Sequence, residues 1–268
     1  MQTINVDGLQ VGPDAPPRIM GVLNLSAESP YDPSVYTDPA AAAAYVEEQL
    51  IGEGADIVDV GLESANKRFE VLDADAELDQ LSVALEVIDR VETPVVWSIE
   101  TRYHEVAEAA LDGGFTMVND VCGFADPQMP IVCAEREAAV SKMASPPDLE
   151  RPGALESVEA LHAAIEREGL TPKTIVDPAF GGWSTGKTTA VDRETFRRLA
   201  EFTAYDRPLL VSINRKNFLR EIAGRPTEDA LPVSLAATAL AVERGANIIR
   251  THDVAETRDA ALVAARLT

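Results

Sequence analysis

Short apolar runs that end in a polar or charged residue recur eight times along the chain. They cover Arg18–Leu25, Asp56–Gly61, Pro94–Glu100, Phe115–Val121, Ala138–Met143, Thr174–Pro178, Pro208–Asn214 and Ala246–Asp253. Their Val and Ile content, with no polar face, is typical of strands buried in a parallel sheet. The polar residues at or near their ends are Asn24, Asp59, Glu100, Asn119, Lys142, Asp177, Lys216 and His252.

Helical patterns separate the predicted strands. Asp38 and Pro39 predict the N-cap and first residue of a helix that runs through Ala40–Glu53 and stops at Gly54. Later helices carry an apolar stripe on one face. The stripes are Leu78, Leu81, Leu85 and Ile88 in the second helix, Val158, Leu161 and Ile165 in the fifth, and Phe196 and Leu199 after a candidate cap, Asp192, in the sixth.

Eight β-then-α units in 268 residues predict a single (β/α)8 TIM barrel over residues 1–268. An open doubly wound sheet is the structural alternative, and the barrel is favoured because the units close at eight without remainder. Residues 1–17 form a lead-in whose Pro-rich Val11–Pro17 stretch is expected to cover the bottom of the barrel. Catalytic groups of such barrels lie at the carboxyl ends of the strands, so the polar strand ends are the candidate site.

Acidic residues outnumber basic ones by 45 to 23, which gives a net charge of -22, and only five of the basic residues are lysines. A surface in which acid replaces lysine stays hydrated in molar salt, so we expect a halophilic protein; an ordinary acidic bacterial enzyme is the alternative. No basic stripe is present to neutralise phosphates, so nucleic acid is not an expected partner.

The apolar runs are of strand length and the N-terminus has no basic, apolar leader. We therefore expect neither a membrane span nor a signal peptide, and a cytoplasmic location. Two cysteines, Cys122 and Cys133, make no disulfide framework or metal cluster.

Five segments at successive strand ends together resemble dihydropteroate synthases. They are Ile19–Leu25 (IMGVLNL), Gly54–Ser64 (GADIVDVGLES), Val118–Gly123 (VNDVCG), Arg215-Lys216 and Arg250–Asp253 (RTHD). The resemblance extends from Arg18 to Leu267. It implies a TIM barrel that joins 6-hydroxymethyl-7,8-dihydropterin pyrophosphate to p-aminobenzoate, forming 7,8-dihydropteroate and pyrophosphate in folate biosynthesis.

One group of strand-end residues suits a pterin, whose pyrimidine edge carries adjacent N–H donors. A carboxylate such as Asp177 can accept a pair of them, and Glu100 can accept another. Asn119 offers both a donor and an acceptor, and Lys216 can donate to a ring carbonyl or nitrogen. The duller alternatives are that Asp177 caps a turn and Asn119 serves loop hydrogen bonds.

A second group suits the pyrophosphate. Arg250 and His252 are two residues apart on one strand, so their side chains point the same way and can bind one anion. Asn24 can bind the phosphate or its Mg²⁺ ion through the amide oxygen. Charge on the departing pyrophosphate would be stabilised by Arg250, His252 and Mg²⁺, after which the aniline nitrogen attacks; Lys216, Arg250 and His252 are the catalytic candidates. The alternative for His252 is a packing role.

The segment Gly181–Thr188 fits a nucleotide-binding phosphate loop, G-x-x-x-x-G-K-[ST]. Such a loop leads directly into a helix, whereas Val191 and Asp192 predict a later helix start, so we interpret the match as a decoy. Lys187 then helps with phosphate or holds the loop. Lys142 departs from the family's histidine at that position, and Arg215 is expected to bridge surface acids.

Two loops also depart from the family pattern, in residues 26–32 and 64–68. In the family they close over p-aminobenzoate and pyrophosphate, so a pterin-binding paralogue without synthase activity remains an alternative. A barrel that passes a methyl group from a reduced folate to a corrinoid is another, which Arg250 and His252 disfavour because a methyl carrier releases no pyrophosphate. A homodimer is possible, and the apolar Leu231–Val242 segment is its candidate interface.

Overall fold

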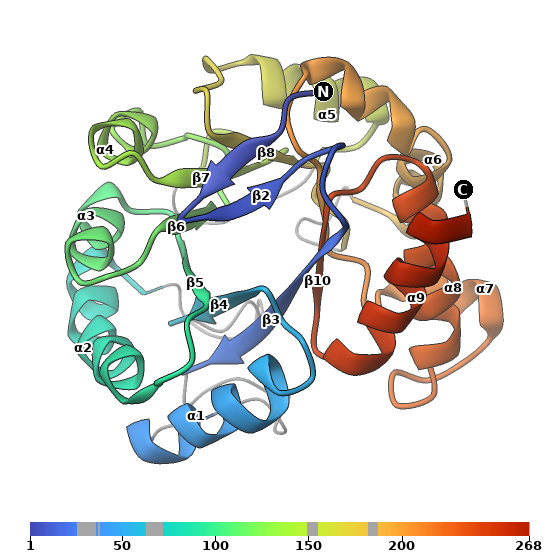
Figure 1. Cartoon of the computed structure of the whole chain (residues 1–268). Coiled ribbons are helices and arrows are strands. Elements are labelled where there is room, and N and C mark those ends of the chain that lie inside the picture. The colour runs from blue at the N-terminus through green and yellow to red at the C-terminus, as the bar shows by residue number, and fades with distance from the viewer. Residues whose placement is uncertain (26–35, 37, 63–71, 149–154, 182–186, 268) are drawn as a thin grey trace.

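The computed structural model describes residues 1–25, 36, 38–62, 72–148, 155–181 and 187–267. Within them an eight-stranded parallel sheet forms a barrel (Figure 1). Its strands are β3 (Arg18–Asn24), β4 (Ile57–Gly61), β5 (Val96–Thr101), β6 (Met117–Asp120), β7 (Ala139–Met143), β8 (Thr174–Asp177), β9 (Leu210–Val211) and β10 (Ile248–Thr251).

The sheet closes on itself between β8 and β9. The strand order is β8-β7-β6-β5-β4-β3-β10-β9, and a parallel bridge joins Val176 to Leu209 across its two ends. The predicted TIM barrel is therefore confirmed, with all eight strands where the sequence placed them. The strand β9 falls furthest short of its predicted range, Pro208–Asn214, because the chain turns after Ile213 and Arg215 takes a left-handed φ of 53°.

Helices surround the barrel as an outer ring (Figure 1). They are α1 (Pro39–Tyr45), α2 (Ala74–Arg90), α3 (His104–Asp112), α4 (Met129–Glu135), α5 (Val158–Glu166), α6 (Thr189–Arg197), α7 (Asn217–Ala223), α8 (Leu231–Glu243) and α9 (Val254–Leu267), with a π-helix, η2 (Val46–Ile51), and a 3-10 helix, η3 (Leu199–Tyr205).

The first helix begins as predicted but changes form. The Asp38 side chain accepts a hydrogen bond from Ala41 N at 2.9 Å, which confirms the N-cap. The helix is not continuous to Glu53, however, because α1 passes at Tyr45 into η2. Gly54 follows with a φ of 102°, a conformation that glycine adopts without strain.

The predicted helical stripes are confirmed in α5 and only in part in α2. Val158, Leu161 and Ile165 are all buried in α5. In α2, Leu81 is buried, whereas the other three predicted positions are partly exposed. A buried acid, Glu77, lies on the inner face and accepts a hydrogen bond from Thr101 Oγ1 of β5 at 2.6 Å.

A hairpin that the sequence reading did not predict covers the bottom of the barrel. It pairs β1 (Ile4–Val6) with β2 (Leu9–Val11), and Figure 1 shows it in dark blue across the barrel's near end. Its apolar side chains pack with the first inward residue of each barrel strand: Met20, Ile57, Val96, Met117, Ala139, Ile175, Leu210 and Ile248. The amino-terminal end of the barrel is therefore covered by the hairpin of residues 4–11, and not by the predicted Pro-rich Val11–Pro17 stretch.

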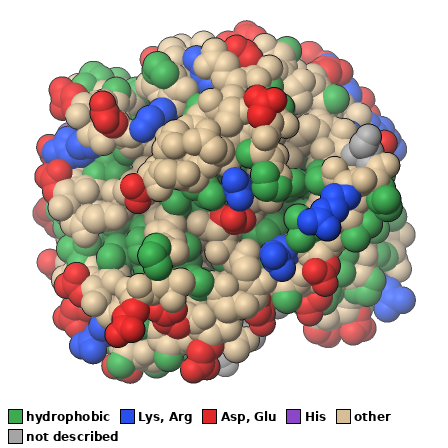
Figure 2. Space-filling model, in the orientation of Figure 1, with side chains coloured by type: hydrophobic (Ala, Val, Ile, Leu, Met, Phe, Trp, Pro, Cys, Tyr) green, Lys and Arg blue, Asp and Glu red, His purple; other side chains and the backbone are tan. Residues whose placement is uncertain are grey.

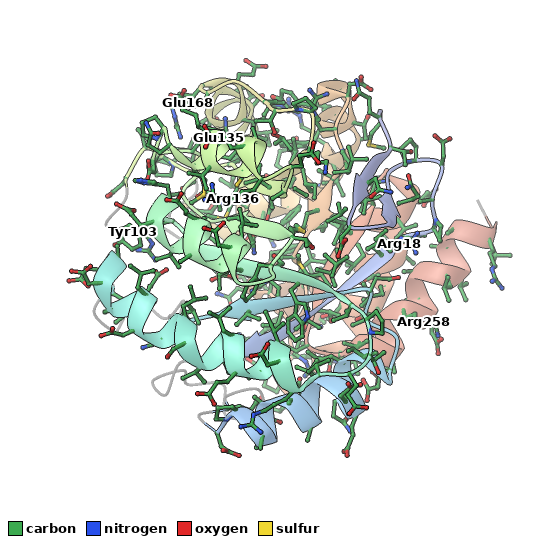
Figure 3. The ribbon with its side chains drawn as sticks, turned by 60° about the vertical axis from the view of Figure 1, so that its left-hand side comes forward. Arg18, Tyr103, Glu135, Arg136, Glu168 and Arg258 are labelled. Atoms are coloured by element: carbon green, nitrogen blue, oxygen red, sulfur yellow. The ribbon has the colours of Figure 1, made fainter. Side chains whose placement is uncertain are left out.

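Arg18 fastens this hairpin to the barrel. Its Nε donates to Gln10 O at 2.9 Å and its Nη1 lies 3.2 Å from Asp56 Oδ1, and Figure 3 labels it beside the hairpin. On the outer ring Arg136, also labelled in Figure 3, joins α4 to α3 through Glu108 and Asp112 at 2.7 and 2.8 Å.

The molecular surface is strongly acidic. Figure 2 shows Asp and Glu side chains around the rim of the face that carries the hairpin, with fewer Lys and Arg among them. No helix within the described ranges is long and apolar enough to cross a membrane.

Candidate active site

Polar side chains from neighbouring strands meet inside the barrel above the apolar layer. Side chains of a strand alternate between its two faces, so Asp59 points inward like Ile57 of the layer below. The Asp59 side chain is fully buried and accepts hydrogen bonds from Ser98 Oγ at 2.6 Å, Asn119 Nδ2 at 3.0 Å and Arg250 Nε at 2.7 Å. It therefore orients residues of three other strands.

Arg250 also reaches Glu100, with Nη2 2.6 Å from Oε2. We call Asp59, Ser98, Asn119, Glu100 and Arg250 the Asp59 network. Burial acts to lower the pKa of Arg250, but the Glu100 and Asp59 carboxylates raise it, so the guanidinium stays charged. Burial raises the pKa of Glu100, and Arg250 opposes that shift.

The sequence reading placed Glu100 and Asn119 with the pterin, Arg250 with the anion, and Asp59 outside both groups as support. The structure joins all four in one network, so the two ends of the predicted site are in direct contact. A guanidinium has five N–H donors, of which the network uses two. Arg250 can therefore hold its carboxylates and still donate to an anion above them.

Asp177 is the last residue of β8, at the same carboxyl-terminal end of the barrel. Its side chain is buried, and Oδ1 accepts a hydrogen bond from Ala179 N at 2.7 Å. Burial raises the pKa of Asp177 to about 6, against the effects of the Ala179 N–H and the charges of Lys216, Lys187 and Arg250. The carboxylate forms at neutral pH and is close enough to Lys216 and Arg250 for their charges to act on it.

Lys216 and His252 share this electrostatic environment. Burial lowers the pKa of Lys216 to about 8, as does Arg250, whereas Asp177, Asp192 and Glu100 raise it. Burial and the charge of Arg250 lower the pKa of His252 to about 4. His252 is therefore neutral at pH 7, so it can contribute a hydrogen bond but no positive charge, contrary to the simplest form of the predicted anion site.

Asn24 lies at the carboxyl end of β3, where it pairs in register with Gly61 of β4. An amide oxygen is a hard ligand that suits Mg²⁺, which commonly keeps several waters and binds through substrate phosphates. The Asn24 side chain fits that pattern as a single protein ligand. Among the described residues, one cluster has three potential metal-ligand atoms close together: His104, Glu105 and Asp126. It lies at the start of α3 in the outer ring, away from Asn24.

Lys142 points away from the site. The sequence pattern had placed it among the polar strand ends that form the candidate site, and that placement was wrong. It is fully buried, and its Nζ donates to Ile165 O at 2.7 Å and Glu168 O at 3.0 Å, which satisfies carbonyls at the end of α5. Its ammonium also lies 4.9 Å from the Phe124 ring centroid. The outward direction of Lys142 follows from strand alternation. Ala139 points inward, and a residue three positions later points to the opposite face.

The sequence led us to expect that Arg215 bridges surface acids. The structure places it instead among the residues at the strand ends, with its side chain only 14% exposed. It forms a bidentate pair with Asp253, with Nε and Nη2 at 2.9 and 2.8 Å from the two carboxylate oxygens. Asn214 Nδ2 donates to the same carboxylate at 2.8 Å. The pair therefore ties the turn before Lys216 to the residue after His252.

The glycine-rich segment requires one correction. Helix α6 starts at Thr189, directly after the Gly-Lys-Thr sequence, and its N-cap is Thr188 rather than Asp192. The predicted late helix start was therefore wrong. The decoy interpretation loses the ground given for it, but the Lys187 side chain is fully buried and its ammonium already has a carboxylate partner, Asp192, at 3.1 Å. Residues 182–186, like the loops 26–32 and 64–68, lie outside the described residues.

Comparison with known proteins gives a consistent picture. The family model described as "Pterin binding enzyme" matches residues 20–252. A probable bifunctional folylpolyglutamate synthase/dihydropteroate synthase of Haloferax volcanii is 33% identical over 89% of this chain, which spans 29% of that relative's length. A dihydropteroate synthase of Neisseria meningitidis serogroup C is 31% identical, with 94% of this chain and 92% of the relative covered.

The solved structures agree. A Xanthomonas albilineans dihydropteroate synthase determined with 4-aminobenzoic acid superposes with a TM-score of 0.81 at 30% identity, over 99% of this chain and 97% of the other. The similarity therefore extends over the whole barrel, including every strand that contributes to the Asp59 network.

Proposed function

The chain belongs to the pterin-binding enzyme family, and from that premise we propose that it is a dihydropteroate synthase. It would join 6-hydroxymethyl-7,8-dihydropterin pyrophosphate to p-aminobenzoate. The observation that carries the proposal is the ring of polar strand ends formed by Asp177 and the Asp59 network. Such a ring offers acceptors for a pterin edge next to a cation for pyrophosphate.

In this proposal the pterin lies between β6 and β8. Asp177, ionised above about pH 6, accepts the paired N–H donors of the pyrimidine edge. Asp59 holds the Nδ2 of Asn119, which turns the amide carbonyl toward the ring as an acceptor. Glu100 accepts a further N–H, and Lys216, whose pKa is about 8, donates to the ring carbonyl or nitrogen.

The pyrophosphate would lie at the ends of β3 and β10, against Asn24, Arg250 and His252. Arg250 is already paired there with Asp59 and Glu100, and His252 is neutral. A pocket of this charge balance favours a pyrophosphate that arrives with a metal cation. When bound, Mg²⁺ would neutralise the leaving group and orient it on the Asn24 amide oxygen.

The reaction breaks the bond between the pterin methylene carbon and the pyrophosphate oxygen, and the oxygen leaves with the bonding electrons. Arg250 and His252 donate hydrogen bonds to the developing charge. The amine of p-aminobenzoate forms the new C–N bond and loses one proton to solvent or pyrophosphate. No protein nucleophile is required, so the residues act by binding, orienting and stabilising charge.

The surroundings of the enzyme can be proposed on physical grounds. The net charge of -22 supports a salt-rich medium. Cys122 and Cys133 are both buried and form no disulfide, which is consistent with a reducing cytoplasm. A homodimer through α8 is supported by an apolar groove of about 340 Å³, which Ile222, Val233 and Leu240 help to line.

Calorimetry with each substrate tests the function. We expect the pterin pyrophosphate to bind with Mg²⁺ present, and p-aminobenzoate to bind once pyrophosphate and Mg²⁺ occupy the anion site. Arg250→Ala should weaken the pterin pyrophosphate more than the bare pterin alcohol, whereas Asp177→Asn should weaken both. Pterin binding without any p-aminobenzoate binding or turnover would replace the synthase with a pterin-binding paralogue.

A further inference from the structure

A buried ion pair lies behind the turn that follows Asp177. Lys187 Nζ is 3.1 Å from Asp192 Oδ1, and the two side chains are 0% and 3% exposed. Removing two charges from water is costly unless further hydrogen bonds satisfy them. Neither residue has a part in the reaction proposed above, so the position of the pair requires another explanation.

Among the described residues, the other side-chain hydrogen bonds of the pair go to the turn after β8. Lys187 Nζ donates to Ala179 O, and Gly181 N donates to both carboxylate oxygens of Asp192, at 3.3 and 3.2 Å. The Lys187 ammonium also lies 5.8 Å from the centroid of the Phe180 ring. The two charges therefore hold three consecutive residues, Ala179 to Gly181.

This turn has a conformation that its sequence disfavours. Ala179 has a φ of 60°, in the left-handed region where an alanine side chain crowds the backbone. Such a residue persists only where its surroundings hold it in place. In this conformation Ala179 N donates to Asp177 Oδ1 at 2.7 Å, so the turn fixes one oxygen of the pterin-facing carboxylate.

The same turn is joined to the helix that follows Lys216. The Phe180 ring stacks on Phe218 of α7, with centroids 5.7 Å apart and planes at 24°. It also meets Phe196 of α6 edge-on at 6.1 Å. A shift of the turn would therefore move Asp177 relative to α6, which follows the turn in the chain, and to α7, which begins next to Lys216.

We propose that Lys187 and Asp192 are positioning residues, whose ion pair holds the 179–181 turn so that Asp177 presents its carboxylate to the pterin. The inference deepens the proposed function and rests on it for the identity of the ligand. The positive charge of Lys187 has a second effect, since it opposes the rise in the pKa of Asp177 that burial causes.

The test removes both charges together in the double variant Lys187→Met/Asp192→Asn, which leaves no uncompensated buried charge. The matched control is Lys142→Met, because Lys142 is also fully buried and bonded to backbone carbonyls but faces the outer helices. The first readout is the ¹³C titration of the Asp177 carboxyl in the ligand-free protein, assigned with Asp177→Asn. The second is the calorimetric Kd of 6-hydroxymethyl-7,8-dihydropterin.

In the double variant we expect the Asp177 midpoint to rise because the nearby ammonium of Lys187 is lost, by less than the roughly one to three units that losing a lone neighbouring cation causes, since the negative charge of Asp192 is removed with it. We expect the pterin Kd to rise about tenfold at pH 7, because a carboxylate whose oxygens are no longer fixed must be ordered by the ligand. Lys142→Met should lower thermal stability and leave both readouts unchanged within about twofold.

A folded double variant with the wild-type midpoint and Kd would overturn the proposal, as would an equal change in Lys142→Met. If the double variant does not fold, the single variant Asp192→Asn is used. It keeps Lys187 but replaces the carboxylate whose two oxygens accept from Gly181 N. An unchanged pterin Kd in that variant overturns the proposal. If the wild type bound no pterin while the Asp177 midpoint still shifted in the double variant, the proposed function would fail and the positioning role would stand.

Discussion

Replacing Asp59 by Asn should destabilise the fold far more than its small change in shape suggests. The fully buried carboxylate accepts three hydrogen bonds, from Ser98, Asn119 and Arg250. An amide has one acceptor oxygen, and its NH₂ group would face at least one of those donors. The variant also leaves Arg250 with Glu100 alone as a carboxylate partner.

The magnitude follows from two contributions. Removing one partner of a buried ion pair costs about 3–5 kcal/mol, and the contact that Arg250 retains with Glu100 puts this case at the lower end. A buried donor left without an acceptor costs about 1–3 kcal/mol, and the contributions of neighbouring groups are not additive. We therefore expect the free energy of unfolding to fall by about 3–4 kcal/mol.

Urea unfolding at a fixed KCl concentration measures this loss, with Asp56→Asn as the matched control. Asp56 precedes the same strand and pairs with Arg18, but the two side chains are 26% and 18% exposed, so its loss should be about 1 kcal/mol. The m-values should stay equal, so that the midpoint shift reports stability. A loss for Asp59→Asn no greater than that for Asp56→Asn would refute the account of the network.

Three further predictions concern the turn, the histidine and the surface. Ala179→Gly should raise the free energy of unfolding by about 1 kcal/mol, because glycine adopts the φ of 60° without strain; thermal unfolding checks this, and a loss would contradict it. The folded-state pKa of His252, about 4, lies below its unfolded value of 6.5, so its stabilising contribution is complete above pH 6.5 and is lost as the pH falls toward 4. The stability of the wild type relative to His252→Gln should therefore fall by up to about 3 kcal/mol between pH 7 and pH 4, and a constant difference would exclude a neutral, buried His252. Raising KCl from 0.1 M to 2 M should raise the unfolding temperature, because salt screens repulsion within a surface of net charge -22, whereas a falling temperature would argue against the halophilic interpretation.

The strands and the candidate residues were predictable because each signal lies within one short segment. A buried parallel strand is apolar on both faces, so its polar end stands out in the sequence alone. The hairpin was missed because β1 and β2 are three residues each, too short for an alternating pattern to register. The N-cap of α6 was misplaced because Thr188 and Asp192 are both good capping residues and the sequence offers no means of choosing between them.

The Asp59 network was beyond local signals because its members are far apart in the chain. Asp59 and Arg250 are separated by 191 positions, and only the pairing of the last strand, β10, with β3 brings their two strands onto either side of β3. Once the strand order is known, the register predicts further contacts of the network. Asp59 of β4, for example, pairs with Ser98 of the adjacent strand β5. The same reasoning would have placed Lys142 outside the barrel, because it follows Ser141 on a strand whose inward layer includes Ala139.

The consequence for function is that binding of the two halves of the substrate should be coupled. Arg250 joins the carboxylates of Asp59 and Glu100, and Asp59 in turn orients Asn119. An anion bound by the remaining N–H donors of Arg250 would share the guanidinium with those carboxylates, and so would change how strongly Arg250 holds the acceptors proposed for the pterin. The structure thus joins in one network residues that the sequence assigned to two ends of a site, and under the proposed function this network would couple pyrophosphate departure to the pterin ring.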